Sequence, residues 1–208
     1  MTNDRNRLRE NKDYDAFLSF HGVEFGLTEG TNGLLVVKTG SGGTIYGHEN
    51  KYLTLAVRIA ESHNVSVIVS DNPLELAPEE NMSITMSVAA DYIASRNVGS
   101  SVFYFGVSKG GQYGAMYGYR YPFVQKWLLL NMPVMINWHK SRAGLMKMPA
   151  EQEVTMLFGE RDPSYPYAEL IDLMRKENIK RVTIPNEDHT FSHAIDEFLR
   201  LPEQFLFP

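Results

Sequence analysis

Residues 102–121 read VFYFGVSKGGQYGAMYGYRY, and this stretch decides the fold. An apolar, aromatic run at Val102–Phe105 meets the pentapeptide GVSKG at 106–110, and an amphipathic, glycine-punctuated segment follows. Strand, G-x-S-x-G and helix, in that order, predict a sharp turn that exposes the hydroxyl of Ser108. Glycines two residues before and after the serine avoid side-chain collisions in such a turn. The N-terminus of the next helix would then direct free N–H groups at an oxyanion beside Ser108.

Three further glycines support this interpretation. Gly111, Gly114 and Gly118 share one face of the expected helix, and each costs roughly 1 kcal/mol relative to alanine in a helix interior. Three on one face predict a helix that lies very close to the sheet. A serine in an ordinary turn can also match the five-residue pattern by chance. The strand before it and the glycine-lined helix after it favour the functional interpretation.

Composition narrows the class of protein. With 208 residues, 43% of them hydrophobic, we expect a polar leader at 1–13 and one globular domain at 14–208. A net charge of −5 gives no reason to expect nucleic acid or an anionic membrane surface as a partner. No apolar run approaches the ~18–20 residues of a membrane span, and the charged N-terminus lacks a signal-peptide core. A cytoplasmic location is the expectation. The absence of cysteine excludes disulfides, thiolate metal ligands and a cysteine nucleophile.

Along the chain, strand-like and helix-like segments alternate. We expect a hairpin or bend in 16–27, broken at His21-Gly22, with His21 in a structural role. The other expected strands are 33–38, 65–69, 102–105, 126–130, 153–158 and 181–184, and the expected helices are 50–63, 81–97, the segment after Ser108, 167–176 and a last one ending near 199. Such alternation predicts an α/β fold with right-handed crossovers, a mostly parallel sheet and helices on both faces.

A second glycine cluster follows the first parallel strand. The sequence TGSGGT at 39–44 can aim backbone N–H groups at an anion, but it matches neither common nucleotide-binding pattern. A flexible connection is an equally good interpretation of the loop alone. Together with the turn at Ser108, the loop is well placed to supply a second donor to an oxyanion.

Functional groups gather at the carboxyl ends of strands in such a sheet. The loop at 40–43, Ser108, Asp162 and His189 all follow expected strands. In GVSKGG at 106–111, FGERDP at 158–163 and DHTF at 188–191, over roughly residues 30–200, the chain resembles a small α/β-hydrolase without a large cap.

The resemblance implies a role for each of these residues. Ser108 would be the nucleophile, His189 the general base and then acid, and Asp162 the carboxylate that orients the imidazole. The backbone N–H of Lys109 and one from Gly40 or Ser41 would form the oxyanion hole. Many relatives begin this loop with His-Gly where this chain has Thr39-Gly40, which leaves the register of the loop open.

Several residues compete for these roles. Asp-Pro turns such as that at Asp162 are common without catalytic meaning. Asp188, Glu160 and Asp71 are rival carboxylates, and His193 is a rival base. Asn131 stands where some family members place the acid. His48, His63 and His139 lack a metal-ligand spacing with carboxylates, so no metal is expected.

The resemblance implies a serine hydrolase that cleaves an ester or thioester of a small molecule through an acyl-enzyme, without a cofactor. An amidase or peptidase would share the mechanism, and a non-catalytic binding protein could share the fold. The oligomeric state stays open, a homo-oligomer included. The interval 132–152 leaves room for a crossover helix and little for a lid, so we expect an open site rimmed by Tyr46, His48 and Trp138-His139. A lid, if one exists, is expected at 73–82.

Overall fold

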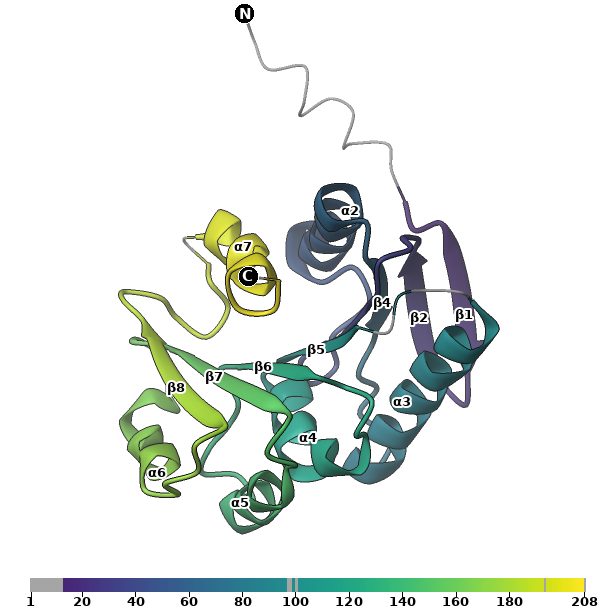
Figure 1. Cartoon of the computed structure of the whole chain (residues 1–208). Coiled ribbons are helices and arrows are strands. Elements are labelled where there is room, and N and C mark those ends of the chain that lie inside the picture. Colours follow the sequence, from purple (N-terminus) through teal and green to yellow (C-terminus); the bar gives the residue numbers. More distant parts are fainter. Residues whose placement is uncertain (1–12, 97–98, 100, 193, 208) are drawn as a thin grey trace, which may run out of the picture.

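An eight-stranded sheet organises the structure, in the order β1-β2-β4-β3-β5-β6-β7-β8 (Figure 1). The computed structural model describes residues 13–96, 99, 101–192 and 194–207. Apart from Asp13, the expected polar leader lies outside the described residues. The strands are β1 (Ala16–Phe20), β2 (Val23–Thr28), β3 (Leu34–Lys38), β4 (Ser66–Ser70), β5 (Val102–Val107), β6 (Lys126–Leu130), β7 (Glu153–Gly159) and β8 (Ile179–Ile184).

The helices connect these strands. The α-helices are α2 (Lys51–His63), α3 (Pro78–Ser95), α4 (Lys109–Tyr117), α5 (Trp138–Lys147), α6 (Glu169–Asp172) and α7 (Ile195–Phe205), and short 3-10 turns occur at His48–Asn50, Gly118–Arg120 and Tyr165–Tyr167. Strands β4, β3, β5, β6, β7 and β8 pair in parallel, and β2 joins β4 antiparallel. The mostly parallel α/β sheet expected from the sequence is confirmed.

The N-terminal hairpin also forms as expected. Strands β1 and β2 pair antiparallel, with Phe20 opposite Val23. His21 and Gly22 between them have φ of 49° and 77°. Positive φ at both central residues matches the twist of a two-residue hairpin. His21 therefore serves a turn, as predicted.

Two apolar cores flank the sheet, because side chains alternate along every strand. On β3, Leu34 and Val36 face the core beneath α3 to α6, whereas Leu35 and Val37 face the core beneath α2 and α7. Figure 1 shows α2 and α7 over one face and α3, α4, α5 and α6 over the other. A sheet covered on both faces leaves its edge of carboxyl strand ends as the place for a site.

Helix boundaries differ from the sequence expectation in several places. Helix α3 begins at Pro78 rather than 81, since proline is favoured in the first helical turn. Helix α2 begins at Lys51, one residue after the expected 50, and its buried residues are Tyr52, Leu55, Ala56, Val57 and Ile59. Helix α6 has four residues where ten were expected, and α7 continues to Phe205, past its expected end near 199.

The glycine face of α4 packs against the sheet. A Cβ atom at Gly114 would lie 2.8 Å from the Leu129 side chain, and one at Gly111 would lie 3.0 Å from the Gly106 oxygen. The close approach predicted from the glycine spacing is confirmed. Gly118 begins the 3-10 turn after α4 and would contact Met148 if it carried a Cβ.

The connection from β6 to β7 contains only α5 and its loops. The interval 132–152 thus serves as a crossover, as expected, and no large cap is inserted there. The segment 73–82, the other expected place for a lid, runs into the first turns of α3. Among the residues described, we find no helix with the length and apolar character that crossing a bilayer requires.

Candidate active site

Ser108 occupies a strained turn between β5 and α4. Its φ of 53° and ψ of −114° lie outside the regions that L-residues usually adopt. A Cβ atom at Gly106 would lie 2.6 Å from the Gly110 oxygen, and one at Gly110 would lie 2.2 Å from the Lys38 oxygen. Only glycine fits at both positions. The buried Tyr104 hydroxyl, which donates to the Gly110 oxygen at 2.8 Å, braces the turn from below.

Three predicted side chains meet at this turn. Nε2 of His189 lies 3.0 Å from Oγ of Ser108, and Nδ1 of the same ring is hydrogen-bonded to Oδ2 of Asp162. The Asp162 side chain is fully buried, and the His189 side chain is 41% exposed. The second oxygen of Asp162, Oδ1, accepts the Ser164 N–H at 2.6 Å. Because one carboxylate oxygen is held by the backbone, the other has a set direction toward the imidazole.

Asn131, which follows β6, holds the histidine loop. Its Nδ2 donates to the backbone oxygens of Asp188 (3.1 Å) and His189 (3.0 Å), and its Oδ1 accepts the Gly159 N–H at 2.8 Å. The side chain thus joins the ends of β6 and β7 to the loop that carries His189. The sequence drew attention to Asn131 only as an amide in a place where relatives carry an acid.

The rival carboxylates are engaged elsewhere. Asp188 accepts hydrogen bonds from the side chain and N–H of Ser192 and from Thr190, and these hold its pKa well below the usual range. Glu160 accepts the Asn186 N–H, and Asp71 accepts the Glu24 N–H. None of these carboxylates contacts an imidazole in the described part of the chain.

The rival base, His193, lies outside the described residues. Across the described ranges, no three histidine, aspartate or glutamate side chains are grouped in a way that could hold a metal ion.

The glycine loop after β3 lies against the nucleophile turn. A Cβ atom at Gly40 would lie 3.4 Å from the Ser108 Cβ and 3.9 Å from its Oγ. The Gly43 N–H donates to the Gly40 oxygen at 2.9 Å, and Gly42 has a φ of 64°, so residues 40–43 form a β-turn of the type that needs glycine in its third position.

The two candidate N–H donors of this loop differ in their surroundings. Burial raises the pKa of Tyr52, and the nearby Gly40 backbone opposes that rise. Within the described residues, the N–H groups of Ser41 and Lys109 donate to no protein acceptor.

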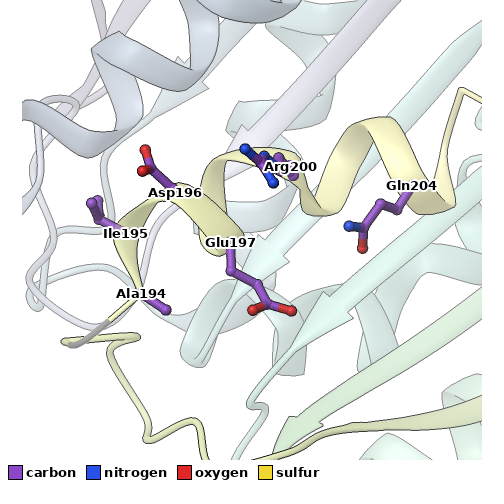
Figure 2. Close-up of a pocket in the computed structure, with 6 residues that line it drawn as sticks. All are labelled: Ala194, Ile195, Asp196, Glu197, Arg200 and Gln204. Atoms are coloured by element: carbon purple, nitrogen blue, oxygen red, sulfur yellow. The ribbon is translucent and has the colours of Figure 1, made fainter.

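A separate hollow of about 470 Å³ runs along α7 (Figure 2). Its lining is Ala194, Ile195, Asp196, Glu197, Arg200 and Gln204. All six come from one helix and the residue before it, so the described lining has no opposing wall. None of the predicted site residues contributes to it.

Comparison with solved structures finds many similar folds. Est1E from Butyrivibrio proteoclasticus superposes with a TM-score of 0.71 at 13% identity, covering 92% of this chain and 97% of its own. An alpha-beta serine hydrolase homologue from Coxiella burnetii gives 0.66 at 13% identity, covering 91% and 96%. S-formylglutathione hydrolase from Staphylococcus aureus gives 0.67 at 14% identity, covering 91% and 94%.

The match spans nearly the whole length of each of these solved chains. No protein-family model matches the sequence, and no curated protein matches it either. The likeness is therefore one of structure: the chain has the fold of a small α/β-hydrolase.

Proposed function

We propose that this protein is a serine hydrolase that cleaves an ester or thioester through an acyl-enzyme on Ser108. One observation carries the proposal: a continuous hydrogen-bonded path from Oδ2 of Asp162 through both ring nitrogens of His189 to Oγ of Ser108. A buried carboxylate, an imidazole and a hydroxyl in this order are what acyl transfer by serine requires.

The first half of the reaction follows from this geometry. Ser108 Oγ attacks the carbonyl carbon of the substrate while its proton passes to Nε2 of His189. Asp162 keeps the remaining ring proton on Nδ1, so Nε2 is the free acceptor, and it stabilises the imidazolium that forms. The carbonyl oxygen becomes an oxyanion, which accepts hydrogen bonds from the N–H groups of Lys109 and Ser41. Collapse breaks the bond to the alkoxide or thiolate, which leaves with the proton from Nε2.

Water completes the cycle. It attacks the acyl carbon and gives a proton to Nε2 of His189, and the second tetrahedral oxyanion is bound as the first was. Its collapse releases the carboxylic acid, and the proton returns from Nε2 to Ser108 Oγ. The strained backbone of Ser108 keeps Oγ exposed at the end of β5 throughout.

Esters and thioesters are the favoured substrate class for two reasons. Their leaving groups need less assistance by general acid than an amine does. The S-formylglutathione hydrolase of similar fold is named for a substrate that is itself a thioester. An amidase or peptidase would use the same three residues, and a partner-binding protein of this fold would not need the hydrogen-bonded path.

A fluorophosphonate probe tests the proposal, because it labels a serine only when a neighbouring base activates it. We expect labelling of the wild type and of Ser95→Ala, a control that removes an exposed serine hydroxyl on α3, and none of Ser108→Ala. Aryl esters, thioesters and aminoacyl amides then define the substrate class. Folded wild-type protein that takes no label would refute the enzyme assignment and favour the binding protein.

A further inference from the structure

Lys38, the last residue of β3, is a buried cation without a buried carboxylate partner among the described residues. Its side chain has no exposed surface. Nζ donates to Ser70 Oγ at 2.9 Å, to the Asp71 backbone oxygen and to Asn81 Oδ1. Three acceptors match the three N–H groups of an ammonium ion. Burial lowers the pKa of Lys38 to about 7, which the nearby Asp71 carboxylate opposes.

A directed chain of hydrogen bonds starts at this amine. Asn81 Nδ2 donates to Asn72 Oδ1 at 2.9 Å, and Asn72 Nδ2 donates to the Thr39 oxygen at 2.9 Å. Both amides are buried. Since the ammonium form of Lys38 offers donors only, it obliges Asn81 to present Oδ1 to it and Nδ2 to Asn72. Asn72 must then present its own Nδ2 to Thr39. The orientation of both amides thus depends on Lys38.

The chain ends on the glycine loop beside Ser108. Besides the bond to Thr39, Asn72 pairs with this loop through its backbone: the Gly42 N–H donates to the Asn72 oxygen, and the Asn72 N–H donates to the Gly43 oxygen, both at 2.9 Å. Three contacts from one asparagine therefore hold the β-turn at 40–43. Because the peptide between Gly40 and Ser41 is planar, the direction of the Ser41 N–H follows from the position of this turn.

We propose that Lys38, Asn81 and Asn72 form a positioning relay that aims the Ser41 N–H at the reaction's oxyanion. The inference rests on the proposed function. An apolar side chain would fill the volume of Lys38 without the cost of burying an amine, so the contribution of the lysine is directional. None of the three residues touches the substrate. They act through the loop.

The relay predicts a defect in kcat and not in KM. Misaiming an oxyanion donor weakens only the transition state, and loss of one such donor lowers kcat by ~10²–10³-fold. For Lys38→Met we expect kcat on p-nitrophenyl acetate to fall about 10- to 100-fold, with KM within about twofold. Affinity for phenylboronic acid, whose tetrahedral adduct places an oxygen in the hole, should fall by a similar factor. Lys126→Met is the matched control, because Lys126 is the first residue of β6 and so lies at the other end of the parallel strands from Lys38. It should change neither kcat nor the affinity for phenylboronic acid.

A second variant separates positioning from stability. Asn81→Asp gives Lys38 a carboxylate partner, but a carboxylate cannot donate a hydrogen bond to Asn72 Oδ1. The Asn72 amide should then turn over to donate to the new carboxylate, and it would no longer donate to the Thr39 oxygen. We expect the urea midpoint of Asn81→Asp to equal or exceed that of Asn81→Ala, while its kcat falls as in Lys38→Met. If activity instead followed stability across these variants, the relay would be merely structural and the proposal wrong. Asn81→Asp keeps the test decisive should Lys38→Met fail to fold.

The outcomes also separate this inference from the proposed function. Wild-type protein without Ser108-dependent labelling or turnover would overturn both. Normal labelling and turnover in the wild type, with kcat and boronate affinity of Lys38→Met within twofold of it, would overturn the relay alone. A Lys38→Met protein with a raised KM and an unchanged kcat would also overturn the relay alone.

Discussion

Replacing Asn131 by alanine should cost both stability and activity, and the structure sets the size of each effect. The change deletes three hydrogen bonds and leaves the buried Gly159 N–H without its acceptor. An orphaned buried polar group costs about 1–3 kcal/mol. Asn131 also has a φ of 49°, where alanine costs roughly 1 kcal/mol more than asparagine. We expect the free energy of unfolding to fall by about 2–4 kcal/mol.

Asn131→Ala should also lower the catalytic rate, because the Asn131 amide holds the loop that carries His189. Without the Asn131 amide, the backbone oxygens of Asp188 and His189 lose their only side-chain donor in the described structure. A displacement of about 1 Å at a reacting group can cost 10²-fold in rate. We therefore expect kcat/KM to fall about 10- to 100-fold and fluorophosphonate labelling to slow in proportion.

Asn131→Gly separates the side chain from the backbone, because glycine accepts a positive φ at little cost. Asn186→Gly is the matched control: it lies in an exposed turn with a φ of 62°, and should change stability and rate little. Urea unfolding and ester hydrolysis measure both effects. If Asn131→Gly kept the wild-type rate within twofold, the reasoning that ties the amide to His189 would be refuted, whatever happened to stability.

Four further predictions follow from the site. Ser108→Ala should lower turnover at least ~10³-fold with an unchanged urea midpoint, since no cysteine can substitute. Asp162→Asn should lower kcat by ~10⁴-fold through the wrong imidazole tautomer, whereas Asp71→Asn should leave it within about twofold. Between pH 7 and 10.5, Lys38 stays protonated in the unfolded chain but loses its proton in the folded protein. The free energy of unfolding should therefore rise with pH over this range, by at most about 5 kcal/mol. This rise should be absent in Lys38→Met. The β6–β7 crossover contains α5 alone and leaves little room for a lid. The rate of hydrolysis of p-nitrophenyl esters from acetyl to palmitoyl should therefore show no jump when the substrate passes its solubility limit. A preference for long acyl chains would mean that a lid exists.

The sequence alone was sufficient for the fold and for the expectation that Ser108, Asp162 and His189 meet at one edge of the sheet. Strand β6 was predicted at its observed bounds, and the turn at Ser108 followed from the glycines at 106 and 110. Both depend on local physics: side-chain alternation along a strand, and collisions between residues two apart in a tight turn. The alternation of strands and helices then brought Asp162 and His189 to the same edge as Ser108, because parallel strands share that edge.

Only the tertiary structure decided among the candidates at that edge. Asp188 is adjacent to His189 in sequence, yet its carboxylate is satisfied within its own loop, and Asp162, 27 residues away, reaches the imidazole instead. Gly40 and Ser41 both suit the oxyanion loop by sequence, and only the fold brings Tyr52 of α2 close to the Gly40 backbone. These outcomes depend on contacts between residues far apart in the chain. No local pattern encodes them, since a hydrogen bond requires a partner that only folding brings within reach.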